Sequence, residues 1–138
     1  SYCGPAGFVN KKEELENARH YIDSLGVKTP SENQLVRYLS GGNQQKVAVG
    51  KWLSADCQVY IFDEPTKGVD VGAKHDIFQL ITDIAKAGKC VLYATSETAE
   101  ILAITDRTYV MYGGRVTAEL KTADATEEEI MYYSTGGK

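Results

Sequence analysis

The sequence predicts an α/β fold with a helical N-terminal part, a mainly parallel sheet with helices, and a C-terminal hairpin. Two short apolar runs, residues 59–62 and 90–95, enclose a helical pattern, which is the order expected of a βαβ unit. The crossover rule makes these two strands parallel. Gly113-Gly114 is a typical two-residue turn between strand-like runs at 107–112 and 115–120.

Two amphipathic patterns indicate helices in the N-terminal part. Between residues 11 and 25, apolar residues recur at spacings of three and four, and Gly26 follows as a C-cap. Ser40 is the predicted N-cap of a second helix, whose apolar face consists of Ala48, Val49, Trp52 and Leu53. Gly50 lies inside this helix, where glycine costs about 1 kcal/mol relative to alanine.

Three further elements follow in the C-terminal part. The run at 59–62 is apolar without alternation, so we predict a strand that is buried on both faces. A helical pattern follows and ends at Gly88. The apolar residues along one face of this predicted helix are Ile77, Leu80, Ile81 and Ile84. A short helix is expected at 97–103, and Thr126 with Glu129 forms a capping-box pattern for a last helix.

Composition limits the class of protein. The chain has 138 residues, 43% of them hydrophobic, and a formal net charge of −4. Its charges are interspersed and no basic stretch tracks a phosphate backbone, so no nucleic-acid partner is expected. No apolar run approaches the roughly 20 residues of a membrane-spanning helix. Three scattered cysteines, Cys3, Cys57 and Cys90, indicate reduced thiols, the last two as small core residues.

Residues 39–45, LSGGNQQ, form a candidate anion site. Glycines beside a serine at a helix N-terminus let a phosphate approach free backbone N–H groups and the positive end of the helix dipole. A turn with a serine cap explains the same residues, so this string alone leaves both interpretations open.

Two adjacent carboxylates, Asp63 and Glu64, follow the apolar run at 59–62. Ligands bind at the carboxyl ends of strands in open α/β sheets. An aspartate there can hold Mg²⁺, often through water, and a neighbouring glutamate can orient or deprotonate an attacking water. A solvated strand end before a turn is the alternative. Asp70 is expected to cap the next helix.

Together these strings resemble the ATP-binding-cassette (ABC) ATPases. LSGGNQQ is similar to their signature motif, VYIFDEPT at 59–66 to their Walker B strand, and residues 67–70 lie at the D-loop position. The longer strings LSGGNQQKV and DEPTKGVDVGAK look like the two-domain ATPases of bacterial ribose, galactose and xylose importers. The resemblance covers residues 10–138 and implies a partial P-loop NTPase fold.

The resemblance implies a role for each matching residue. The signature contacts the γ-phosphate of ATP held by the opposite ABC domain, and the D-loop aspartate couples the two sites. Asp63 helps to hold Mg²⁺, and Glu64 polarises the hydrolytic water. Asn43 stands where most members have glutamine. The implied nucleotide-binding set is Leu39, Ser40, Gly41, Gly42, Asn43, Gln44 and Asp70.

The family's switch histidine is replaced by a serine. Alignment on Glu100-Ile101 puts Ser96 at the histidine position. A hydroxyl cannot match an imidazole as a γ-phosphate contact and proton-linked switch. Ser96-Glu97 resembles the second domain of the sugar importers, which supports that assignment. We therefore expect Ser96 to be a catalytic-site residue of a site that hydrolyses ATP poorly.

No phosphate loop of the form G-x-x-x-x-G-K-[ST] occurs in the sequence. We therefore expect a C-terminal part of the second ABC domain of a longer protein. Residues 1–54 form its helical subdomain, and 55–138 form the C-terminal part of a RecA-like core. The chain alone is expected to bind ATP negligibly and to be inactive. Open sheet edges predict that it dimerises.

The resemblance also implies cofactors and partners for the full-length protein. ATP and Mg²⁺ are the cofactors. The partners are the first ABC domain of the same chain, transmembrane permease subunits and, indirectly, a periplasmic or lipoprotein sugar-binding protein. The location is peripheral, on the cytoplasmic side of the bacterial membrane. Two alternatives remain: a non-catalytic dimerisation or regulatory domain, favoured by Ser96 and opposed by Glu64, and a nucleoside-importer ATPase, opposed by the intact Asp63-Glu64 pair.

Overall fold

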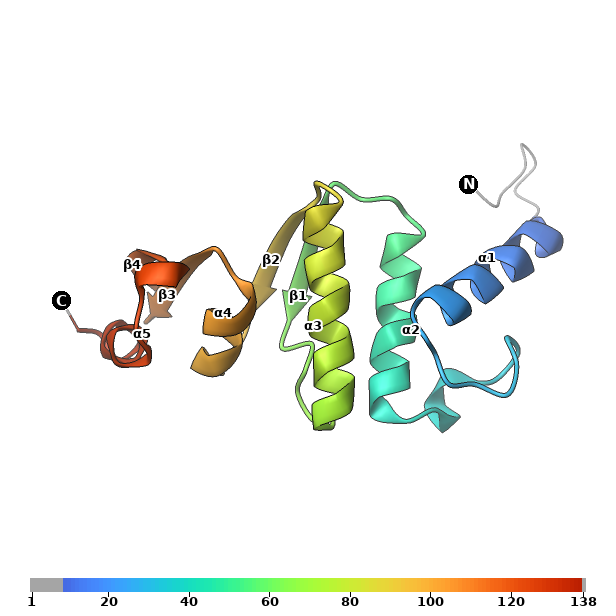
Figure 1. Ribbon diagram of the computed structural model, residues 1–138, viewed down its shortest axis with the longest axis horizontal. Helices are drawn as coiled ribbons and strands as arrows, with labels where there is room; N and C mark the ends of the chain where they lie inside the picture. Colours follow the sequence, from blue (N-terminus) through green and yellow to red (C-terminus); the bar gives the residue numbers. More distant parts are fainter. Residues whose placement is uncertain (1–8, 138) are drawn as a thin grey trace. The chain divides into compact units, whose positions relative to one another are not determined.

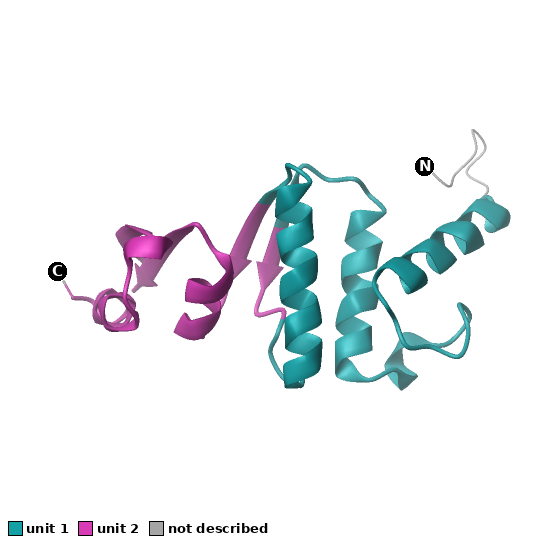
Figure 2. Cartoon of the chain, in the orientation of Figure 1, with its two compact units in different colours: residues 1–60, 66–90 teal, residues 61–65, 91–138 magenta. Residues whose placement is uncertain are grey.

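The computed structural model describes residues 9–137, so Cys3 lies outside the described residues. The chain divides into two compact units (Figure 2). Unit 1 contains residues 1–60 and 66–90, and unit 2 contains residues 61–65 and 91–138. Mixed helices and strands confirm the predicted α/β class.

Unit 1 is built on three helices, α1 (Lys11–Ser24), α2 (Gly41–Leu53) and α3 (Val71–Lys86), with a short 3-10 turn at Val36–Tyr38. Helices α2 and α3 lie side by side (Figure 1). Asn10 caps α1 by accepting hydrogen bonds from the backbone N–H groups of residues 12 and 13. The apolar side chains buried in this unit include Val27, Val49, Ile77, Ile81 and Ile84.

The predicted apolar face of α2 is only partly correct. Val49 is buried, but Trp52 is 56% exposed and Ala48 is also exposed. Gly50 is the reason that α1 comes close, because a Cβ atom there would lie only 3.1 Å from the Leu25 Cδ1 atom. The glycine that weakened the helix prediction therefore serves packing between helices.

Strands β1 (Val59–Asp63) and β2 (Cys90–Ala94) form a two-stranded sheet. The backbone N–H of Cys90 donates to the Gln58 carbonyl, and the N–H of Glu64 donates to the Ala94 carbonyl, each at 2.9 Å. The strands therefore advance in the same direction, which confirms the parallel βαβ unit.

The prediction that β1 is buried on both faces is wrong. Tyr60 and Phe62 are buried, whereas Val59 is 56% and Ile61 is 70% exposed. The alternation arises because side chains of a strand point to opposite faces in turn, and only one face is covered within the described chain. Cys90 is exposed for the same reason, contrary to its predicted place in the core.

Unit 2 consists mainly of a hairpin with two short helices. Strands β3 (Arg107–Tyr112) and β4 (Arg115–Lys121) pair antiparallel, as predicted. Both turn glycines have positive φ, 56° and 75°, as a type I′ turn requires. Helices α4 (Thr98–Ile104) and α5 (Glu127–Ser134) complete the unit, with Val110 and Ile130 buried. The Thr126 side chain accepts the Glu129 N–H, as its capping pattern predicts.

Candidate functional site

The signature segment, residues 39–44, forms the start of α2. Ser40 occupies the N-cap position, with φ −62° and ψ 157°, as predicted, but its side chain makes no capping hydrogen bond. The first backbone bond of the helix runs from the Gln44 N–H to the Ser40 carbonyl. Within the described chain, no partner is recorded for the N–H groups of the residues between them, Gly41, Gly42 and Asn43. This end of α2 therefore presents hydrogen-bond donors.

Side-chain amides hold the signature segment in place. The Asn43 Oδ1 atom accepts from the Lys28 N–H at 2.8 Å, and its Nδ2 donates to the Ser40 Oγ at 2.8 Å. The Gln44 Nε2 donates to the Leu39 carbonyl at 2.8 Å. The link to Lys28 was not foreseen in the sequence, because the two residues are fifteen positions apart and no local pattern joins them.

The two signature glycines meet different surroundings. A Cβ atom at Gly42 would lie 2.6 Å from the Ala73 Cβ atom of α3, which is closer than any real contact. A Cβ atom at Gly41 would have the Gly68 carbonyl oxygen as its nearest neighbour, at 4.0 Å. Gly42 is thus required for α2 to pack on α3, whereas Gly41 leaves open space beside the donors.

The carboxylate segment, residues 63 and 64 with Ser96, lies in unit 2. Asp63 ends β1 and is exposed. Glu64 has a φ of +47°, a left-handed conformation that costs a non-glycine residue about 1–2 kcal/mol. Its Oε1 atom accepts from the Ser96 N–H at 3.1 Å. The structure thus brings the two predicted catalytic residues together, through the backbone of Ser96 rather than its hydroxyl.

A buried carboxyl group supports the loop that carries Ser96. Glu100 is 3% exposed, and its Oε2 accepts from the Tyr93 hydroxyl at 2.5 Å and the Thr95 hydroxyl at 2.8 Å. The Thr95 Oγ1 in turn accepts from the Glu97 N–H at 3.1 Å. Sequence reasoning used Glu100 only for alignment. No local pattern in the sequence indicates that this carboxyl is buried.

Asp70 caps α3, as expected, because its Oδ1 atom accepts from the Ala73 N–H at 2.9 Å. Ala73, in the first turn of α3, is also the residue that faces Gly42 of α2. Among residues 9–137, no three His, Cys, Asp or Glu side chains lie close enough together to hold a metal ion.

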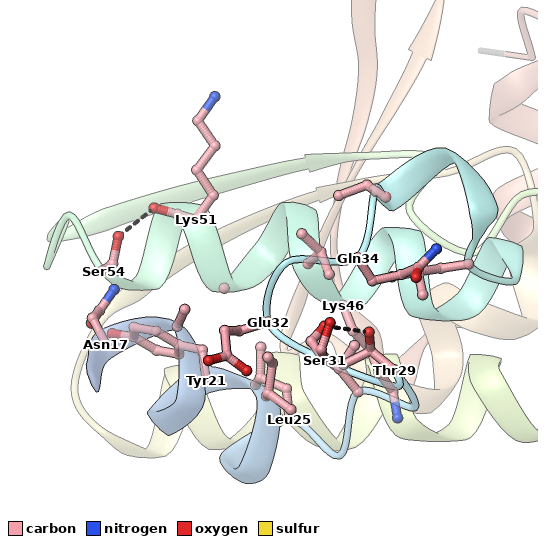
Figure 3. A pocket seen from close by; sticks show the side chains of 17 residues that line it. Asn17, Tyr21, Leu25, Thr29, Ser31, Glu32, Gln34, Lys46, Lys51 and Ser54 are labelled. Carbon is pink, nitrogen blue, oxygen red and sulfur yellow. Dashed lines mark hydrogen bonds between the residues drawn. The ribbon is translucent and has the colours of Figure 1, made fainter. Parts of the chain in front are cut away.

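A cavity of about 230 Å³ lies in unit 1 between α1, α2 and the segment before α2 (Figure 3). Tyr21 and Leu25 line its apolar part, and Glu32 lies at its polar part. Arg19 donates to Glu32 at 2.7 Å, which holds the pKa of that carboxyl below its usual value. Of the predicted site residues, only Leu39 lines this cavity, so it is separate from the donors of the signature segment.

None of the helices formed by residues 9–137 has both the length and the apolar character of a membrane span. Residues 6–67 match the family model described as ABC transporter. The chain is 50% identical over 127 residues to the arabinose import ATP-binding protein AraG of Pectobacterium atrosepticum, covering 91% of this chain and 25% of that protein. It is 47% identical over 130 residues to a protein of Agrobacterium fabrum named for ribose, galactose and methyl galactoside import, covering 94% and 26%.

The chain thus spans about a quarter of the length of these curated relatives. A solved ATP-binding cassette, described as a dimer bound to ADP and phosphate after hydrolysis, superposes with a TM-score of 0.74 at 24% identity. The superposition covers 86% of this chain and 51% of the cassette, and shows a shared fold. The family match, the sequence identity and the fold agree with the motifs at the two segments, and the chain belongs to the ABC transporter family as part of an ATP-binding cassette.

Proposed function

We propose that this chain is the C-terminal part of the second ABC domain of an importer ATPase that couples ATP hydrolysis to the uptake of a monosaccharide. One observation carries the proposal. The similarity to proteins named for arabinose, ribose and galactose import extends over more than nine-tenths of the chain at about half identity. That stretch includes the signature segment, the Asp63-Glu64 pair and Ser96.

Each segment contributes half of an ATP site. The donors at the start of α2, Ser40 to Asn43, suit the γ-phosphate of ATP bound by another ABC domain. Asp63 suits Mg²⁺, and Glu64 suits the attacking water. Leu39 and Gln44 hold the segment through their hydrogen bond, and we assign to Asp70 the coupling of the two sites.

In this proposal residues 1–54 are the helical subdomain and 55–138 are the C-terminal part of the RecA-like core. The full-length protein works with its own first ABC domain, with permease subunits and, through them, with an external sugar-binding protein. It lies peripherally on the cytoplasmic side of the membrane. The chain alone lacks a phosphate loop and does not turn over ATP. Its exposed β1 side chains, Val59 and Ile61, favour self-association of the isolated chain.

The two ATP sites are unequal in this proposal. Ser96 contacts Glu64 through its N–H, so the serine orients the carboxylate, but its hydroxyl cannot replace an imidazole. The site that contains Glu64 is therefore the slower of the two. The serine at position 96, in place of the family's histidine, is the specific observation in favour of a regulatory role for that one site.

Steady-state ATP hydrolysis by the full-length protein, assembled with its permease, tests the proposal. Hydrolysis is expected in the unmodified protein, and Glu64→Gln is expected to lower it, because an amide cannot accept a proton from water. Glu128→Gln is the matched control, since that exposed glutamate lies in the first turn of α5. Absence of hydrolysis in the full-length assembly would refute the proposal.

A further inference from the structure

The hydrogen bonds around Asn43 have a fixed polarity. A backbone N–H can only donate, so the Asn43 atom 2.8 Å from the Lys28 nitrogen must be the carbonyl oxygen. The amide nitrogen of Asn43 then faces the Ser40 Oγ at 2.8 Å. An amide nitrogen also can only donate, so the Ser40 oxygen must accept.

This polarity leaves the Ser40 hydroxyl proton for an external acceptor. The hydroxyl has one proton, and it does not cap α2, the local role for which serine is usually selected. No acceptor for this proton is recorded among the residues that the structure describes. Ser40 is exposed, whereas Asn43 is half-buried, so the proton can reach a ligand at the surface.

We propose that Asn43 is a positioning residue, which acts through Ser40 by fixing its hydroxyl as a hydrogen-bond donor to a phosphate oxygen. The proposal rests on the function proposed above and refines it. Asn43 links Lys28, in the segment before α2, to the signature serine. A serine hydroxyl can donate or accept a hydrogen bond, and the Asn43 amide leaves it to act as a donor toward a ligand. The Ser40 hydroxyl then adds a donor to the N–H groups of the first turn of α2, which suits an anion that has only acceptors.

A double-mutant cycle in the full-length protein, assembled with its permease, tests this inference. Ser40→Ala removes the hydroxyl, and Asn43→Ala removes its fixed orientation without adding charge. Ser40→Ala is expected to lower kcat for ATP hydrolysis about tenfold, the effect of losing one hydrogen bond to a charged group. Asn43→Ala is expected to lower kcat about threefold to tenfold, with KM for ATP within about twofold, because another domain holds the nucleotide.

The decisive quantity is the effect of Asn43→Ala on kcat in the presence and in the absence of the Ser40 hydroxyl. If Asn43 acts through the hydroxyl, adding Asn43→Ala to Ser40→Ala lowers kcat by less than about twofold more. If Asn43→Ala lowers kcat by the same factor with and without the hydroxyl, Asn43 is merely structural and the inference is wrong. Gln45→Ala is a neighbouring control in the same turn and is expected to be independent of Ser40.

The outcomes separate this inference from the proposed function. Full-length protein that does not hydrolyse ATP, or whose hydrolysis is unchanged by Ser40→Ala, overturns the proposed function of the signature segment and this inference with it. A loss with Ser40→Ala together with no coupling to Asn43→Ala overturns this inference alone.

Discussion

The signature segment and the carboxylate segment present opposite hydrogen-bonding character. At the start of α2 the protein presents donors, namely free N–H groups and the Ser40 hydroxyl. The Asn43 side-chain amide donates a hydrogen bond to the oxygen of this hydroxyl. At the end of β1 it presents an acceptor, the Glu64 carboxylate, which the Ser96 N–H holds. The first suits a phosphate and the second suits a cation or a water proton. In the proposed function each segment supplies half of an ATP site.

The two segments also differ in backbone conformation. The signature segment uses glycine where another helix comes close, and no non-glycine residue in it has positive φ. The carboxylate segment places a glutamate in the left-handed region, at φ +47°. Strain of this kind persists where a side chain is needed at that point, which agrees with a chemical role for Glu64.

The largest stability effect is expected at Gly42. Gly42→Ala puts a methyl group 2.6 Å from the Ala73 Cβ atom, so α2 and α3 must separate. The free energy of unfolding should fall by about 1–3 kcal/mol, the usual cost of overpacking. Urea denaturation of the chain measures it. Gly41→Ala, which enters open space, should change stability by less than about 0.5 kcal/mol; equal losses would contradict the distinct roles of the two glycines.

Asp70 is expected to show the next effect, because its side chain caps α3. Asp70→Ala should lower the free energy of unfolding by about 0.5–2 kcal/mol, and Asp70→Asn by much less, since asparagine caps equally well. Thermal or urea unfolding of the two variants checks this. A loss of ATP hydrolysis in Asp70→Asn, with stability intact, would separate its proposed coupling role from capping.

At Glu64 we expect a smaller effect, in which the glycine variant is the more stable of two variants. Glycine adopts positive φ without penalty, so Glu64→Gly should be more stable than Glu64→Ala by about 1 kcal/mol. The comparison of the two variants by urea denaturation cancels the loss of the Ser96 contact, which both share. If Glu64→Gly were the less stable of the two, the backbone strain would not be real.

The smallest effect concerns pH. The hydrogen bond from Lys46 holds the pKa of the Asp76 carboxyl below its ordinary value, and this pair joins α2 to α3. Since the folded pKa is the lower one, the stabilisation is present above the ordinary value of about 3.9 and is lost as the pH falls through the folded pKa. Asp76→Asn should therefore reduce the loss of stability between about pH 6 and about pH 3. An unchanged pH profile would show that the exposed pair contributes nothing, as many do.

Periodicity predicted the order of elements and most of their positions. Ile77, Ile81 and Ile84 are buried as the helical pattern requires, and the Gly-Gly hairpin and the Thr126 cap were found from local turn and capping chemistry. These features depend on neighbours in sequence, which is why one chain suffices to predict them.

Burial of β1 and contacts between distant segments could not be predicted in this way. An apolar run indicates a strand suited to a buried sheet, but Ile61 is exposed because no described residue covers its face of β1. The Lys28–Asn43 bond and the Glu100 cluster depend on how the chain folds back, and no spacing rule encodes them. The chemical motifs were visible in sequence, whereas the residues that hold them in place were not.

In the proposed function the signature segment and the carboxylate segment serve two unequal ATP sites. Gly41→Asp puts a negative charge beside the signature donors without the α3 clash of Gly42→Asp, and Glu64→Gln removes the acceptor at the slower site. Steady-state ATP hydrolysis by the full-length protein with its permease tests the claim most directly. We predict that Gly41→Asp abolishes hydrolysis, as we expect of Gly42→Asp, whereas Glu64→Gln leaves a measurable part of it. Equal losses from Gly41→Asp and Glu64→Gln would contradict the account.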